Sequence, residues 1–145
     1  MLESVADDLF SALEIADRLR KIDDAAASKR PAPGKWSKKE ILGHLIDSAA
    51  NNHQRFVRLQ LTPRIDLPGY EQDNWVRVQR YQEHAWHGII ELWQVYNTYL
   101  ASLIRTVDPA TLRHVWHTPD GTEVDLEFIM RDYVRHLRHH LNQIL

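Results

Sequence analysis

Three histidines are the residues whose type and spacing could most readily support chemistry. His136 and His140 lie four positions apart near the end of the chain, and His44 lies in an earlier segment. Side chains four apart are neighbours on a helix surface, so both imidazoles can bind one ion. A third imidazole from a facing helix would leave coordination positions open for water or substrate, as in catalytic metal sites. Imidazole ligands suit zinc, nickel, copper or iron.

The spacing of apolar residues selects these three from the nine histidines of the chain. At about 100° per residue, His136 and His140 fall at the edge of the apolar arc of the last helix, whereas His139 falls outside it. The second helix carries a polar strip along the margin of its buried face: His44, Ser48, Asn51 and Arg55. His53 lies on the opposite side and is expected to be exposed. No consistent face is formed by four further histidines, also expected to be exposed: His84, His87, His114 and His117.

The spacing of the three histidines also allows interpretations other than a catalytic metal site. The bare H-x-x-x-H pattern is weak, and Leu137 stands where an H-E-x-x-H protease has its general base. The three residues could be hydrogen-bonded histidines without a metal. A structural ion would need a fourth protein ligand, for which no compelling candidate is visible. The alternatives to an enzyme are therefore a non-catalytic metal-binding module or a dimeric interaction protein with an exposed apolar stripe.

Four amphipathic helices are expected to position these residues. Their predicted ranges are 5–22, 37 to about 61, 82–107, and about 125 to the end. The second begins at a capping box formed by Ser37 and Glu40, and the last at Asp125, a plausible N-cap. A connector covers 25–35, and the loop 62–73 leads to a short helix around 72–78. Asp120-Gly121 indicates a turn, and a small hairpin is possible within 111–124.

The fold class that follows is all-α, an antiparallel four-helix bundle with longer connections after the first two helices. Its 145 residues fit one domain, 1–145. The stripe of the third helix is predicted from apolar spacing: Ala85, Ile89, Leu92, Trp93, Tyr96, Leu100, Leu103 and Val107. Trp86 and Trp93 are expected in the core.

Composition excludes several function classes. The chain has no cysteine, which rules out disulfides, thiolate metal sites and a cysteine nucleophile. The net charge is −2 with no long run of one sign, so neither a nucleic-acid nor a membrane partner is expected. The N-terminus lacks the pattern of a signal peptide, and no apolar run approaches the ~20 residues of a membrane span. The expected location is the cytoplasm.

Three motifs together resemble the DinB/YfiT-like superfamily. They are Trp36-Ser37-x-x-Glu40-Ile41-x-x-His44-Leu45, the segment Gly69-Tyr70-Glu71-Gln72-Asp73-Asn74-Trp75, and the terminal run from Tyr133 to Ile144 with its H-x-x-x-H pair. The resemblance spans residues 36–145. It implies a DinB-like bundle, often a homodimer, with a divalent metal, typically nickel or zinc, on His44, His136 and His140. Relatives of this kind include enzymes that use low-molecular-weight thiols such as bacillithiol or mycothiol, so a thiol-dependent transferase or a hydrolase acting on a small molecule is expected.

Five further residues are candidates for the site. Asp132 lies one turn before His136 and could accept its free ring N–H, or it could be a surface charge. Asn51 and Arg55 could position a substrate, although arginine on a helix is more often an ion-pair partner. Tyr70 and Asp73 lie on a loop, where functional residues concentrate.

Overall fold

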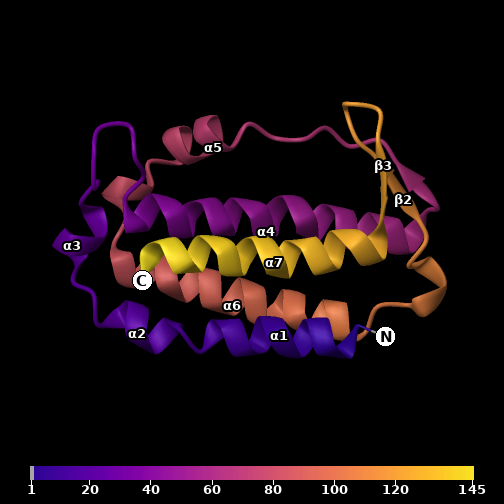
Figure 1. Cartoon of the computed structure of the whole chain (residues 1–145), viewed down its shortest axis with the longest axis horizontal. Helices are drawn as coiled ribbons and strands as arrows, with labels where there is room; N and C mark the ends of the chain where they lie inside the picture. Colours follow the sequence, from indigo (N-terminus) through magenta and orange to yellow (C-terminus); the bar gives the residue numbers. More distant parts are fainter. Residues whose placement is uncertain (1) are drawn as a thin grey trace.

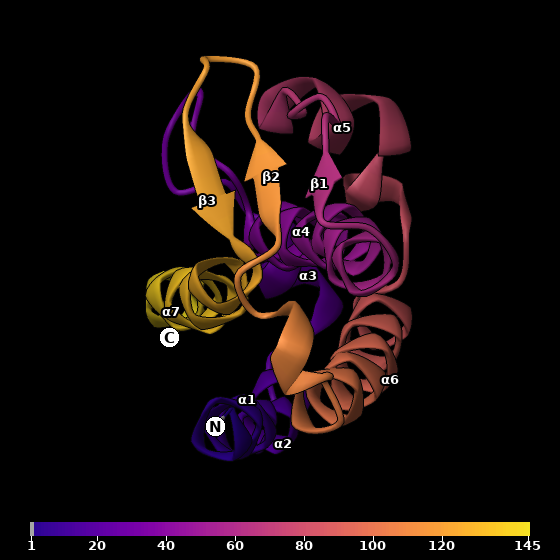
Figure 2. The ribbon, with the colours of Figure 1, turned by 90° about the vertical axis from the view of Figure 1, so that its right-hand side faces the viewer.

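The computed structural model describes residues 2–145, and four helical rods make up most of it (Figure 1). The rods are α1 (Glu3–Leu13) extended by α2 (Ala16–Arg20), then α4 (Lys38–Leu61), α6 (Trp86–Arg105) and α7 (Leu126–Ile144). Viewed from one end, they surround a common core in the order α7, α4, α6, α1 (Figure 2). The predicted four-helix bundle is confirmed.

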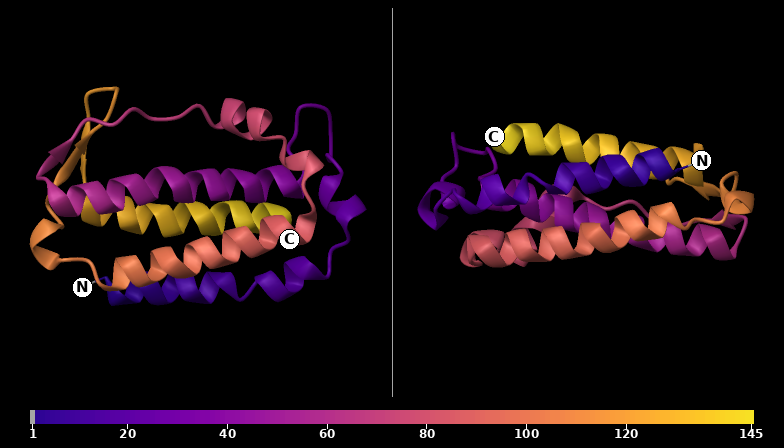
Figure 3. Two further views of the ribbon diagram at one scale, coloured as in Figure 1. Left: turned by 180° about the vertical axis from the view of Figure 1, so that it is seen from behind. Right: turned by 90° about the horizontal axis from the view of Figure 1, so that it is seen from below.

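The directions of the helices follow from one long connection. Residues 62–85 leave the end of α4 and return along the outside of the bundle, so α6 begins beside the start of α4 (Figures 1 and 3). α4 and α6 consequently run the same way, and α1 and α7 run opposite to them. The connection contains β1 (Arg64–Ile65), α5 (Gln72–Gln79) and the 3-10 turn η1 (Tyr81–Glu83).

Helix boundaries differ from the predictions in three places. The predicted helix 5–22 is interrupted after Leu13, where the amides of Glu14 and Ile15 bond three residues back instead of four and tighten the chain. The connector 25–35 contains the end of a short helix, α3 (Asp24–Ser28), which the Asp23 side chain caps at the amide of Ala26, 2.7 Å away. The helix predicted over 82–107 begins only at Trp86, because η1 precedes it.

The predicted stripe of the third helix is confirmed in part: four residues are buried (Ile89, Trp93, Leu100 and Val107), Tyr96 and Leu103 are half-buried, and Ala85 and Leu92 are exposed. Trp86 and Trp93 are fully buried, as expected. Leu92 was expected to be buried and is 52% exposed, because it lies on the side of α6 that turns away from the other helices.

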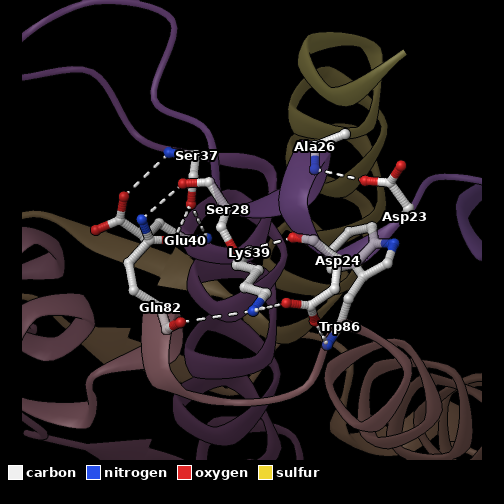
Figure 4. Close-up of polar contacts among 9 residues, drawn as sticks. All are labelled: Asp23, Asp24, Ala26, Ser28, Ser37, Lys39, Glu40, Gln82 and Trp86. Carbon is white, nitrogen blue, oxygen red and sulfur yellow. Dashed lines mark hydrogen bonds and ion pairs between the residues drawn. The ribbon is translucent and has the colours of Figure 1, made fainter.

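The start of α4 is fixed by a polar cluster (Figure 4). The predicted capping box is present: Ser37 accepts from the amide of Glu40, and the Glu40 carboxylate accepts from the amide of Ser37. Lys39 is 3% exposed and pairs with Asp24 at 3.1 Å. The other oxygen of Asp24 accepts from the amide of Trp86 at 2.8 Å. One carboxylate thus joins α3, α4 and the start of α6.

A small sheet closes the opposite end of the bundle (Figure 2). After η2 (Pro109–Thr111), the possible hairpin is found as β2 (Val115–His117) and β3 (Glu123–Asp125), and β1 adds to β2 in parallel. Gly121 has φ +90°, which suits glycine in the hairpin turn. Asp125 caps α7, as predicted, by accepting from the amide of Phe128. Among residues 2–145, no helix combines the length and apolarity needed to cross a membrane.

Candidate metal centre

The structure brings the three predicted histidines together at the contact between α4 and α7. His44 lies on the second turn of α4, and His136 and His140 lie on successive turns of α7. One ring nitrogen from each lies within 4.8 Å of the other two. His44 is fully buried and the other two are half-buried. We call these three residues the metal centre, because they form a group that could hold an ion.

The geometry of the metal centre fits a divalent ion. The Nε2 atoms of His44 and His136 lie 3.4 Å apart. Two imidazole nitrogens at 2.0–2.1 Å from a tetrahedral ion would be separated by roughly 3.4 Å. The His140 ring completes a three-nitrogen face, with its centroid 4.7 Å from that of His44 and 4.5 Å from that of His136. Three nitrogens leave at least one coordination position for water or substrate.

Burial keeps two of the three imidazoles neutral. Burial, together with smaller effects of the neighbouring His140 and His136, lowers the pKa of His44 to about 3. Burial likewise lowers the pKa of His136 to about 4, with a smaller effect of His140 in the same direction. Neutral imidazole is the form that binds metal. Near neutral pH these ligands therefore need not release a proton before an ion binds.

Gln143 is a site residue that was not among the sequence candidates. Its Oε1 lies 2.9 Å from Nδ1 of His140. A proton on Nδ1 donated to this oxygen leaves Nε2 of His140 free to bind an ion. The available signal was the i, i+3 spacing of the two residues, which places them on one face of a helix.

Asp132, offered either as an orienter of His136 or as a surface charge, pairs with Arg135 in the structure. Its carboxylate accepts from Nε of Arg135 at 3.0 Å, and no hydrogen bond to His136 is found among the described residues. Arginine three positions along the same helix is within reach of the carboxylate and competes for it. The charge of Asp132 nonetheless acts on the pKa of His136, which it raises slightly against the larger effect of burial.

A groove of about 250 Å³ leads from His136 between α4 and α7 to the small sheet. We call it the Arg55 groove; its lining is Ser48, Asn52, Arg55, Tyr70, Trp116, Thr118, Val124, Phe128, Ile129, Asp132, Tyr133 and His136. The candidates Arg55, Tyr70 and Asp132 thus lie in one place. Asn51 lies outside this lining, and its side chain donates to the carbonyl of Asp47 at 2.9 Å. The neighbouring Asn52 faces the groove in its place.

A second groove, of about 430 Å³, opens on the other side of the metal centre. We call it the Asp73 groove, because that candidate lines it together with Trp36, His140 and Gln143. Asp73 is therefore near the metal centre but apart from Arg55 and Tyr70. The ring of Trp36 also lies 5.1 Å from that of His44 and covers it.

The remaining histidines separate into two groups. His139, His84 and His87 are exposed, as expected. His53, His114 and His117 are half-buried, contrary to expectation. Their surroundings explain the difference: α6 packs beside α4, so Nδ1 of His53 meets the Tyr96 hydroxyl at 2.9 Å, and the hairpin packs on the end of α4, so Nδ1 of His114 meets the Leu59 carbonyl at 2.5 Å.

Comparison with known proteins agrees with this architecture. The chain is 26% identical to "Putative metal-dependent hydrolase YfiT" of Bacillus subtilis (strain 168) over 99% of its own length and 78% of that protein. It is 21% identical to a "Putative metal-dependent hydrolase" of Bacillus mycoides (strain KBAB4), over 90% of this chain and 75% of the relative. The solved structure of Bacillus subtilis YfiT, described as a four-helix bundle of unusual topology, superposes with a TM-score of 0.75 at 22% identity, covering 98% of this chain and 81% of YfiT. The family model of the DinB superfamily matches residues 11–144, and the chain belongs to that superfamily.

Proposed function

We propose that this protein is a metal-dependent enzyme that acts on a small molecule. The observation that carries the proposal is the convergence of three ring nitrogens within 4.8 Å at the end of a groove. The names of the two Bacillus relatives, which describe metal-dependent hydrolases, support it. Three imidazoles suit several divalent ions, and we propose zinc or nickel because the resemblance to the DinB/YfiT-like superfamily implies them.

The residues of the chain have separable tasks in this proposal. A bound divalent ion would lower the pKa of a water or thiol and so make a nucleophile available near neutral pH. His44, His136 and His140 hold that ion, and Gln143 fixes the ring of His140. The apolar and aromatic side chains of the Arg55 groove exclude water beside the reacting group. If water is the nucleophile, the reaction is a hydrolysis.

A thiol transferase is the second candidate, and a specific observation favours it. The metal centre borders two grooves, the Arg55 groove through His136 and the Asp73 groove through His140. A transfer between two substrates needs room for both next to the reacting centre. We propose that in this case a low-molecular-weight thiol occupies one groove and its electrophilic partner the other.

One experiment separates these functions. Protein prepared without a histidine tag and loaded with zinc or nickel is incubated with activated esters and with alkylating electrophiles, each with and without small thiols. Turnover of esters without thiol supports the hydrolase, and turnover that requires a thiol supports the transferase. Either activity should be lost in His44→Ala and kept in His53→Ala, a histidine of the same helix outside the metal centre. Metal-loaded protein that is inert in every combination would favour a non-catalytic module.

We also propose that the chain forms a homodimer. Three large side chains on α6 are more than half exposed: Leu92, Val95 and Tyr99. They lie three to four positions apart and so form one stripe along the helix. Sedimentation of the wild-type chain should give a dimer and that of Val95→Asp a monomer. A wild-type monomer at micromolar concentration would contradict this part of the proposal.

A further inference from the structure

Arg55 is a buried cation without an ionic partner in the described structure. The residue is 8% exposed. Its one hydrogen bond within residues 2–145 runs from Nη1 to the amide oxygen of Asn52, at 3.2 Å. Burial lowers the pKa of its guanidinium, and no carboxylate acts on it in the opposite direction. A guanidinium has five N–H donors, so most of them have no partner in the protein. None of these free nitrogens is fully enclosed by the described residues, so they stay open to a ligand.

The orientation of the guanidinium is fixed toward the groove. Its central carbon lies 3.8 Å from the centre of the Trp116 ring, so the group is stacked on the indole. The indole is itself held in place by a 2.8 Å hydrogen bond from Nε1 to the carbonyl of Leu67. Side chains of a helix lean toward its N-terminus, which for Arg55 is the direction of Ser48 and His44. The fork is therefore preorganised at the far end of the groove that begins at His136.

We propose that Arg55 binds a carboxylate group of the substrate. A planar guanidinium can donate two parallel hydrogen bonds to a carboxylate, and stacking on Trp116 leaves the edge of the fork available for them. The hydroxyls of Tyr70 and Ser48 line the same groove and can donate to the same group. The substrate class that follows is a small organic acid whose reacting group lies at the opposite end, next to His136.

The charges of the groove favour a monoanion. Arg55 is the one lysine or arginine in the described lining of the groove. The one carboxylate there, that of Asp132, already pairs with Arg135 outside the groove. At the Arg55 end of the groove, a single guanidinium matches the one charge of a carboxylate better than the two charges of a phosphate monoester. A role of Arg55 in catalysis rests on the proposed function, whereas binding of a carboxylate by Arg55 does not require the metal.

The test uses the full chain without a tag, freed of metal with EDTA. The probes are 3-phenylpropionate, its neutral amide 3-phenylpropionamide, and benzylphosphonate. Binding is followed by the indole N–H signal of Trp116 in a nitrogen–proton NMR spectrum, assigned with Trp116→Phe. We expect the carboxylate to bind at least about tenfold more tightly than the amide. In Arg55→Gln the two should bind within about twofold of each other, and Arg55→Lys should be intermediate because it lacks the fork.

The matched control is Arg58→Gln, which removes an exposed arginine one turn away on the same helix, bonded to Gln54. This variant should keep the preference for the carboxylate. Equal binding of carboxylate and amide by the wild-type chain would overturn the proposal even if Arg55→Gln failed to fold. Tighter binding of the phosphonate would overturn the assignment to a carboxylate. A chain that prefers the carboxylate but binds no metal would refute the proposed function alone, and one that binds metal without the preference would refute this inference alone.

Discussion

The Nδ1 atom of His140 and the Oε1 atom of Gln143 lie 2.9 Å apart on adjacent turns of α7. Because this contact sets which nitrogen of His140 carries the proton, Gln143→Leu should lower the affinity for zinc by about 10–100-fold while leaving the fold intact. Titration calorimetry measures the change. Asn142→Leu alters the neighbouring exposed residue and should leave the affinity unchanged. An unchanged affinity in Gln143→Leu would show that the contact does not orient the ligand.

Gly43, next to His44, is predicted to tolerate no larger residue. A Cβ atom at this position would clash with the ring of Tyr81. Gly43→Ala should therefore lower the free energy of unfolding by about 1–3 kcal/mol, although alanine favours a helix by up to about 1 kcal/mol. Gly88→Ala in α6 is the control, since a Cβ there meets open space, and it should be neutral or stabilising. Urea unfolding of both variants measures the change in the free energy of unfolding, which should fall for Gly43→Ala and stay equal or rise for Gly88→Ala.

A buried hydrogen bond between α7 and α6 is expected to matter for stability. The hydroxyl of Tyr133 donates to the side-chain oxygen of Asn97, and both residues are almost fully buried. Tyr133→Phe leaves that oxygen without its donor and should lower the free energy of unfolding by about 1–3 kcal/mol. Replacing Asn97 by leucine in the same chain should recover part of the loss. Urea unfolding of the single and double variants measures both changes. Equal stability of the wild type and Tyr133→Phe would show that this hydrogen bond does not stabilise the fold.

Acid is predicted to destabilise the metal-free protein through the metal centre. The pKa of His44 is about 3 and that of His136 about 4 in the folded chain, against 6.5 for an ordinary histidine. Their contribution to stability is complete above pH 6.5, and it is lost as the pH falls through 4 for His136 and toward 3 for His44, because the unfolded chain then binds more protons. Two such groups give a slope of about 1–2 kcal/mol per pH unit after allowance for partial exposure.

Urea unfolding between pH 4.5 and 7.5 measures that slope. The double variant His44→Gln/His136→Gln should show a markedly smaller slope, whereas His139→Gln, which changes an exposed histidine, should not. A slope that is the same in the double variant and in the wild type would assign the acid sensitivity to other groups.

Much of the fold was predictable because its signals are local. The capping box of Ser37 and Glu40, the N-cap Asp125 and the turn at Gly121 each depend on residues a few positions apart. The break after Leu13 was missed because no glycine or proline marks it. The parallel course of α4 and α6 was also missed, since it depends on where residues 62–85 return rather than on any local pattern.

The candidate site was predictable only where helix periodicity determines direction. It placed His44, His136 and His140 at the margins of buried faces, and the structure brings them together. It did not choose between Asn51 and Asn52, because the two residues lie three and four positions from Ser48 and both spacings place a side chain beside it. Trp116 was not a candidate, since it reaches Arg55 only through the packing of the hairpin on α4. Contacts between distant segments leave no trace in spacing alone.

The measurement that tests the metal centre most directly is a zinc or nickel titration of the chain purified without a tag. We expect one ion per chain, with binding lost or severely weakened in His44→Ala, His136→Ala and His140→Ala and retained in His139→Ala and His53→Ala. A chain that takes up no ion after incubation with either metal, or that binds equally well without His44, would contradict this expectation.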